Sequence, residues 1–216
     1  MASLNSNLSA MREPHQASDA VESLAIPRNV LALAGVAHPE KTRYAMNGIM
    51  LERVGRECRA VATDGKRLAI VEWTDTTEGG GGDVARVLPC DLATKAAKAA
   101  KAAKVGEVEA SLNGRAELKI RDDSVSGDVV EGHFPPYRDV LKGEREEIVV
   151  GINASLLEGL AKALHEAKDT GAKRGNYVVR LRISKGNPAE APIIVETCSG
   201  NGSFTGIGLL MPVDIG

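Results

Sequence analysis

Four lysines recur at every third position of an alanine-rich stretch, which makes a local group of positive charge. They are Lys95, Lys98, Lys101 and Lys104, and no acidic residue stands between them. A helix over Leu92–Lys104 would place these ammonium groups on one half of the wheel and the leucine and alanines on the other. We expect no acidic partner on this helix, so phosphate oxygens would supply the missing counter-charge. The alternative is a solvated face without a ligand.

Two further residues could contact phosphate or a base. Arg43 and Tyr44 precede a predicted strand, at a point where a loop should project from the fold. A guanidinium group beside an aromatic ring can bind a phosphate and stack on a base. A solvated turn explains the same two residues equally well, so both interpretations stay open.

No combination of residues in the sequence indicates catalysis or metal binding. His15, His38, His133 and His165 lie at spacings that no zinc site uses, either with one another or with a cysteine. A turn histidine explains His133 better than a general base, since no nucleophile or paired carboxylate accompanies it. We therefore predict a protein that is not an enzyme and that binds no cofactor and no metal.

Composition and charge narrow the class of protein. The chain has 216 residues with 43% hydrophobic side chains, which is sufficient for one large domain or two small ones. The net charge is -2, so any nucleic-acid contact must come from a local basic patch. Three well-separated cysteines (Cys58, Cys90, Cys198) and the absence of a long apolar run predict reduced thiols in a cytoplasmic protein.

Short strands and turns organise the stretch from Arg43 to Trp73. Apolar runs at 49–51, 60–62 and 68–71 are separated by Val54-Gly55-Arg56 and by Asp64-Gly65. An Asp-Gly pair between apolar runs is a strong hairpin signal, because glycine adopts positive φ without steric cost. These features predict three consecutive antiparallel strands joined by two tight turns.

The same order of elements recurs three times along the chain. A short apolar strand, a turn residue and an Ala/Leu-rich helix occur at 21–37, 85–103 and 147–164, and three strand-like runs follow each. The turn points Pro27, Pro89 and Gly151 are evenly spaced, and Asp91 and Asn153 are candidate helix caps. The predicted fold class is α+β, with three βαβββ units whose antiparallel sheets carry helices on one face.

Three blocks of sequence resemble the bacterial DNA sliding clamp, the β subunit of DNA polymerase III. They are Tyr44–Leu51 with Ala62–Ala69, the segment Glu131–Arg138 (EGHFPPYR), and the end of the chain, Leu210–Ile215 (LMPVDI). The first two resemble the middle domain of the clamp, and the third resembles its C-terminal tail. The resemblance predicts a leader without order at 1–20, a complete clamp-like domain at 21–143 and half of a clamp-like domain at 144–216.

What the family does supplies expectations for this chain. The resemblance implies a non-catalytic processivity or scaffold protein that encloses duplex DNA without reading its sequence. Arg43, Tyr44 and the four lysines match positions that face DNA. A pocket for peptides of DNA polymerase or of other clamp-binding proteins would be formed, by motif match, by Met46, Thr63, Gly65, Lys66, Arg67, Leu68, Pro135, Val140, Leu209, Leu210, Met211, Pro212 and Val213.

The number of units sets the expectations for assembly. The family ring has about twelve βαβββ units, whereas this chain has three, so we expect a homo-oligomer, either a dimer that shares its third units or a tetramer that closes a ring. Asp139 and Asp214 stand where the family usually places basic residues beside the pocket. The alternative function is therefore a clamp-derived interaction module that binds clamps or their partners without enclosing DNA.

Overall fold

The computed structural model describes residues 23–40, 44–76, 83–141, 148–168, 178–198 and 204–214. The chain divides into two compact units, Met1–Gly143 (unit 1) and Glu144–Gly216 (unit 2), and each is described by itself below. The predicted leader at 1–20 and the candidate residue Arg43 lie outside the described residues. Whether the units work as one complete and one half domain stays a prediction.

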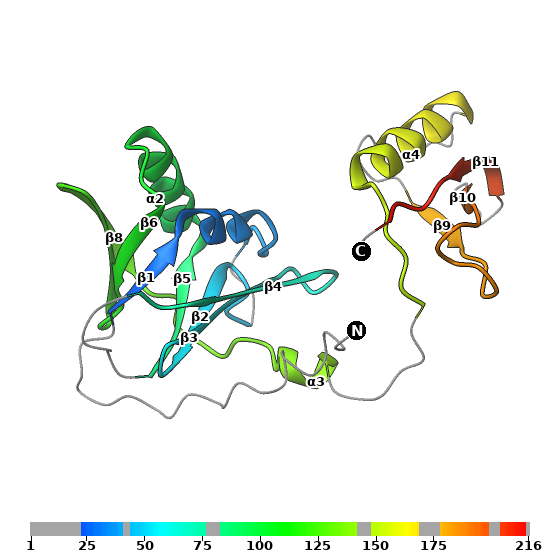
Figure 1. Ribbon diagram of the computed structural model, residues 1–216. Helices are drawn as coiled ribbons and strands as arrows, with labels where there is room; N and C mark the ends of the chain where they lie inside the picture. The colour runs from blue at the N-terminus through cyan, green and yellow to red at the C-terminus, as the bar shows by residue number, and fades with distance from the viewer. Residues whose placement is uncertain are drawn as a thin grey trace. The chain divides into compact units, whose positions relative to one another are not determined.

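Unit 1 contains two successive runs of strand, helix and three strands. The first run is β1 (Ser23–Pro27), the 3-10 helix η1 (Arg28–Gly35), β2 (Gly48–Val54), β3 (Glu57–Thr63) and β4 (Leu68–Thr74). The second is β5 (Val84–Pro89), α2 (Cys90–Ala102), β6 (Glu107–Ser111), β7 (Arg115–Ile120) and β8 (Asp123–Asp128), followed by the short helix α3 (Tyr137–Leu141). In Figure 1, η1 and α2 lie next to each other on the two sheets.

The two runs exchange their first strands. The sheets have the orders β1-β6-β7-β8 and β4-β3-β2-β5, and every pairing in them is antiparallel. Thus β1 joins the sheet of the second run, with Pro27 opposite Glu107, and β5 joins the sheet of the first, with Pro89 opposite Gly48. Neither run has a complete sheet of its own, so the two fold as one body.

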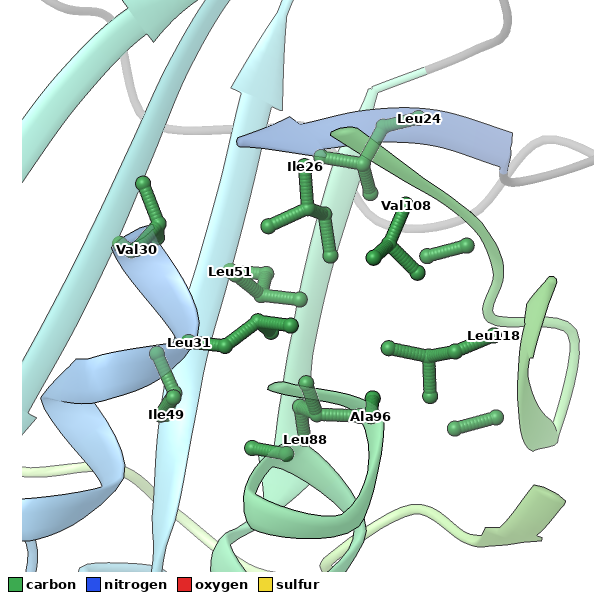
Figure 2. Packing of buried hydrophobic residues seen from close by; sticks show 14 of the residues in the cluster. Leu24, Ile26, Val30, Leu31, Ile49, Leu51, Leu88, Ala96, Val108 and Leu118 are labelled. Carbon is green, nitrogen blue, oxygen red and sulfur yellow. The ribbon is translucent and has the colours of Figure 1, made fainter. Parts of the chain in front are cut away.

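The core of unit 1 is shared by both runs. Leu24 and Ile26 of β1 are fully buried beside Val108 of β6, and Leu31 of η1 lies close to Leu51 and Leu88 (Figure 2). Ala93, Ala96 and Ala100 form the buried side of α2, where small side chains allow the helix to approach the sheets closely. The low aromatic content is consistent with this aliphatic packing.

A buried ion pair joins β2 to the residue that follows β4 in unit 1. Arg53 Nη1 donates to Asp75 Oδ2 at 2.8 Å, and the partners are 0% and 4% exposed. The same carboxylate accepts the backbone N–H of Ala25, and Trp73 Nε1 donates to the Ala25 carbonyl oxygen. These contacts attach the exchanged strand β1 to the end of β4.

Unit 2 contains α4 (Ala154–Lys168), β9 (Val179–Arg182), β10 (Ile193–Cys198) and β11 (Phe204–Leu210). Its antiparallel sheet has the order β11-β10-β9. Among the described residues 148–153, which precede α4, none belongs to a strand, and Gly151 makes a single bridge to Val213. Ile193, Val195 and Leu210 form a small core, against which Leu157 and Leu160 of α4 pack. The count of three complete βαβββ units therefore stays a prediction.

The antiparallel sheets with helices on one face agree with the predicted fold class, while several local details differ. The first predicted helix is a 3-10 helix without a side-chain cap, since Pro27 stands at its N-terminus. Asp64 and Gly65 lie in a four-residue turn between the paired residues Thr63 and Leu68, which joins β3 and β4 as the predicted antiparallel hairpin. Across the described residues, no helix is long and apolar enough to cross a membrane.

Candidate functional site

The lysine face lies on α2, as its sequence pattern predicts. Leu92, Ala96 and Ala100 are buried, while Lys95, Lys98 and Lys101 project from the opposite side and are exposed. Lys104 lies beyond the helix, which ends at Ala102, and its backbone has a φ of 57°. Lys98 and Lys101 border a groove between α2 and η1 whose floor includes Leu31 and Ala97. The ammonium groups thus stand beside an apolar seam between two helices.

One expectation for this face was wrong, because α2 does carry an acidic partner. Asp91 Oδ2 lies 3.8 Å from Lys95 Nζ, with both side chains more than two-thirds exposed. Asp91 makes no capping hydrogen bond, since Pro89 occupies the cap position. In contrast, Asn153 caps α4 as predicted, accepting the N–H groups of Ser155 and Leu156. Lys98 and Lys101 are therefore the better candidates for an external phosphate.

Tyr44 stands in acidic surroundings. The residue is 44% exposed and borders a surface hollow of about 820 Å³, which Asp91, Asp128 and Glu131 also line. Three carboxylates make this hollow unfavourable for a phosphate group. The geometry thus separates Tyr44 from the lysines that share its predicted role.

The turn between β3 and β4 holds three of the predicted pocket residues, Gly65, Lys66 and Arg67, and is fixed by Asp64. Its Oδ1 accepts the N–H groups of Lys66 and Arg67, each at 3.0 Å, and its Oδ2 accepts Arg67 Nε. The hydrogen bond from Lys66 is the largest of the effects that lower the pKa of Asp64 to about 2. Gly65 has a φ of +83°, a conformation that glycine adopts without strain.

This turn is also attached to the neighbouring helix. Arg67 Nη2 donates to the carbonyl oxygen of Gly35 at 3.0 Å, at the C-terminal end of η1. Thr63 is buried and donates its hydroxyl to the Arg67 carbonyl, while Lys66 and Arg67 stay exposed and Leu68 is half-buried. The turn therefore exposes the cationic side chains of Lys66 and Arg67 and part of the Leu68 side chain, on a backbone fixed by hydrogen bonds.

A buried polar network holds α3 against the sheet. Glu52 on β2 accepts the hydroxyl of Tyr137 at 2.6 Å and is bound by both Nη atoms of Arg138. Arg59 donates to the same Tyr137 oxygen and to Glu72. Burial is the first of the causes that raise the pKa of Tyr137 to about 12, so the phenol stays protonated and keeps donating to Glu52.

A shallow groove of about 190 Å³ follows from this arrangement. It lies between Met50 of β2 and the segment that contains Pro135 and Asp139. The neighbouring Val140 is 61% exposed, although α3 itself is anchored. Met46 is half-buried and sits two residues before β2, at the end of the sheet where Thr63 ends β3. Of the pocket residues predicted in unit 1, Pro135 lines this groove, whereas Met46 and the residues of the β3–β4 turn do not. The predicted pocket therefore stays a prediction.

The pocket residues predicted in unit 2 lie on and after its edge strand β11. Leu209, Met211 and Val213 alternate with inward-facing residues and are 64%, 58% and 41% exposed, and Ile207 extends the same apolar row. Gly208 faces α4, where a Cβ atom would meet the side chain of Leu160 at under 3 Å. Leu210 departs from the prediction because its side chain is 6% exposed and belongs to the unit 2 core.

Sequence reasoning passed over the residues that fix the candidate site. Glu52, Arg59 and Tyr137 are buried polar groups that the sequence patterns did not indicate, and Asp64 was identified only as a turn residue, not as the acceptor that orders the turn. Asp64 had a usable signal, since an aspartate before glycine often binds the backbone two residues on. Within the described ranges, no group of three or more His, Cys, Asp or Glu side chains could hold a metal ion.

Comparisons with known proteins agree on one family. The family model for the central domain of the DNA polymerase III beta subunit matches residues 21–136. Beta sliding clamps of Proteus mirabilis and Pseudomonas aeruginosa are each 29% identical, over 174 and 170 residues that make up 74% and 75% of this chain. The chain spans less than half of those relatives, 44% and 46% of their lengths.

Solved structures show the same fold. The beta subunit of Caulobacter crescentus polymerase III has a TM-score of 0.68 at 21% identity, over 96% of this chain and 55% of that one. The beta subunit of the Streptococcus pyogenes DNA polymerase has a TM-score of 0.69 at 18% identity, over 94% and 52%. Given the match over more than half of its residues, the chain belongs to the DNA polymerase III beta subunit family, the bacterial sliding clamps.

Proposed function

We propose that this chain is a clamp-type, non-catalytic scaffold that contacts duplex DNA through α2 and docks partner peptides on unit 1. The observation that carries the DNA contact is the pair Lys98 and Lys101. Both lysines are exposed and border the groove between α2 and η1, in a chain with the sliding-clamp fold. Contacts of ammonium groups with phosphates carry no sequence information, so the binding is to any duplex. Its strength depends steeply on salt because bound counterions are released.

Charge reversal on α2 tests the DNA contact. The double variant Lys98→Glu/Lys101→Glu should lower the slope of log affinity against log salt by about 2, one for each phosphate that is no longer neutralised. Fluorescence anisotropy of a labelled duplex, titrated at several salt concentrations, measures this slope. The matched control is Arg115→Glu/Lys119→Glu, which makes the same charge change on exposed positions of β7.

Two results would contradict the DNA contact. One is a wild-type chain whose binding to linear and to circular duplexes shows no dependence on salt. The other is equal weakening by the α2 variant and by its control on β7, which would assign the effect to net charge. Enclosure of DNA, as distinct from contact, is tested by whether the chain stays on a closed circle but leaves a linear duplex by its ends.

The groove along β2 supports a peptide-docking role. A docking site needs exposed apolar side chains on a rigid base with a few polar groups that fix the direction of the peptide. Met50 and Pro135 line this groove, and the exposed Val140 follows Asp139 at its border. The β3–β4 turn adds a second patch, with the half-buried Leu68 and the exposed Lys66 and Arg67. Their backbones are held by Asp64 and by the network around Glu52. We therefore propose an extended peptide with apolar and acidic residues as the ligand.

An aspartate in the groove tests this docking site. Val140→Asp should weaken binding of a labelled clamp-binding peptide at least tenfold, since a buried carboxylate would be left without a partner. The control, Ser126→Asp, adds the same charge at an exposed position of β8. Equal affinities of wild type and Val140→Asp would remove the groove from the proposal. Leu209, Met211, Pro212 and Val213 remain a separate proposed contact surface of unit 2, tested by Leu209→Asp.

The second candidate function is a clamp-derived interaction module without a role on DNA. The observation that favours it is electrostatic: Lys95 is paired with Asp91, and Tyr44 borders a hollow with three carboxylates. The two functions differ in the same pair of titrations. Peptide binding without salt-dependent duplex binding supports the module, whereas both activities together support the scaffold on DNA. In either case we propose a cytoplasmic homo-oligomer.

A further inference from the structure

The exchanged strands of unit 1 define how two βαβββ runs complete each other. In each run the strand before the helix (the leading strand) leaves its own sheet and pairs with the first strand after the helix of the other run. Thus β1 pairs with β6, and β5 pairs with β2. Because both pairings follow the same rule, the two runs are related by an approximate two-fold axis.

Each leading strand also keeps one contact with its own run. Two residues before the cap Pro27, Ala25 receives the side chains of Asp75 and Trp73 from the end of its own sheet. Two residues before the cap Pro89, Val87 accepts the N–H of Val130, which follows β8. One edge of the leading strand is therefore held by its own run, and the other edge pairs with the opposite run.

The segment 148–153 (the leading segment of unit 2) makes the contact with its own run. Two residues before the cap Asn153, Gly151 accepts the N–H of Val213, which follows β11. Val150 and Ile152 pack on the unit 2 core, as Leu24 and Ile26 do in unit 1. The leading segment is thus already held as a leading strand by its own run, with its other edge unpaired among the described residues.

The matching acceptor edge is open on the same unit. β9 is the first strand after α4, the place that β2 and β6 occupy in unit 1, and it stands at the end of the order β11-β10-β9. Across the described ranges no strand pairs with its outer edge. In unit 1 the same place is filled, and the facing residues Val108 and Ala110 of β6 are fully buried.

Exposed apolar side chains lie on the leading segment, on β9 and on α4. Val149 of the leading segment is 66% exposed, Val178 and Leu181 at β9 are 58% and 36% exposed, and Leu156 on α4 is 58% exposed. In unit 1 the leading strands and the paired helices bury their apolar residues against each other. An unpaired edge with apolar neighbours is a site for strand addition.

We propose that two copies of this chain join through unit 2, each adding its leading segment to the β9 edge of the other. This deepens the homo-oligomer of the proposed function, on which it rests. The choice of a second copy follows from reciprocity, since donor and acceptor lie on one unit and a two-fold axis satisfies both at once.

A lysine at the acceptor edge tests the proposal. Leu181→Lys places a charge on β9 and should convert a two-chain species into a one-chain species, as measured by sedimentation velocity on the full chain. The matched control is Ile207→Lys, which changes an exposed apolar residue on β11, at the opposite edge of the same sheet. This control should keep the mass of the wild type. Circular dichroism of both variants establishes that they fold.

A second measurement does not depend on any variant. Hydrogen exchange of the wild type across a dilution series should show amides at 148–152 and 179–182 that are protected only where the two-chain mass is present. A one-chain wild type at every concentration overturns the proposal. So does a two-chain mass that Ile207→Lys abolishes and Leu181→Lys leaves unchanged, because the contact would then lie on β11.

The remaining outcomes separate this inference from the proposed function. A four-chain wild type supports it only if Leu181→Lys yields a two-chain species. A two-chain mass that depends on Leu181, in a protein without salt-dependent duplex binding, leaves the inference standing and removes the DNA contact. Salt-dependent duplex binding by a one-chain species leaves the DNA contact standing and overturns the inference. Lys98→Glu/Lys101→Glu should leave the mass unchanged.

Discussion

The two units of this chain show the same elements in a complete and an incomplete setting. In unit 1 the helix α2 buries Leu92, Ala93, Ala96 and Ala100, whereas α4 of unit 2 has Ala161 and His165 buried and its leucines half-exposed. The sequence of α4 is the more apolar, yet it is the less covered. Burial therefore depends on whether a second run supplies a leading strand and a helix, more than on the amphipathic pattern of one helix.

The largest predicted effect contrasts the ion pairs of the two units. Asp75→Ala should cost about 3–5 kcal/mol in unit 1, because it leaves the fully buried Arg53 without its carboxylate. Arg182→Ala, which removes a 62% exposed partner of Glu196 in unit 2, should cost less than about 1 kcal/mol. Urea unfolding followed by Trp73, the single tryptophan, reports unit 1, and hydrogen exchange in β10 reports unit 2. Similar costs would mean that the two pairs are equally solvated.

A second pair of variants compares the leading strands. Ile26→Ala should destabilise unit 1 by about 2–5 kcal/mol, since the side chain is fully buried. Ile152→Ala at the equivalent place should cost less in a dilute one-chain sample, because Ile152 is half-buried. The same unfolding measurements apply. If the proposed dimer forms, the cost of Ile152→Ala should rise with protein concentration, and a constant cost would argue against strand exchange.

Removal of one hydroxyl tests how firmly unit 1 holds its groove. Tyr137→Phe removes the donor to Glu52 and the acceptor for Arg59, so we expect a loss of about 1–3 kcal/mol and weaker peptide binding. Thermal unfolding and peptide anisotropy measure the two effects. Tyr44→Phe is the control at an exposed tyrosine and should change stability by less than about 0.5 kcal/mol. Peptide binding unchanged by Tyr137→Phe would mean that α3 does not need this anchor.

The smallest predicted effect is a pH dependence confined to the turn of unit 1. The folded pKa of Asp64 is about 2, below the ordinary value of 3.8, so its contribution is present above about pH 4. This contribution is lost as the pH falls through 2, where the carboxylate gains a proton. Amide shifts of Lys66 and Arg67 should follow this titration, and Asp64→Asn should abolish it. A midpoint near pH 4 in the wild type would show that the turn hydrogen bonds are weak in solution.

Sequence patterns were sufficient for most helices and strands of the described residues and for the exposed side of α2. The spacing of Lys95, Lys98 and Lys101 predicted that they are exposed on α2, because residues three apart lie on the same face of a helix. The alanines between them include the buried Ala96 and Ala100. Asn153 caps α4 as its residue type predicts, and Leu157, Leu160 and Leu164 face the sheet of unit 2. These features depend on neighbours in sequence, so local rules determine them.

Tertiary structure decided what depends on distant partners. The repeat indicated runs of one strand, one helix and three strands, but only the fold shows that β1 and β5 change places, since strand pairing is not encoded within either run. Asp75 and Glu52 hold β1 and α3 through hydrogen bonds to residues far away in the sequence. Asp64 holds its turn through a side-chain conformation that the sequence does not specify. Leu210 was predicted in the peptide pocket and lies in the core of unit 2, because alternate residues of β11 face α4. The outer edge of β9, which no described strand pairs with, likewise became apparent only by comparison with β6, whose equivalent edge pairs with β1.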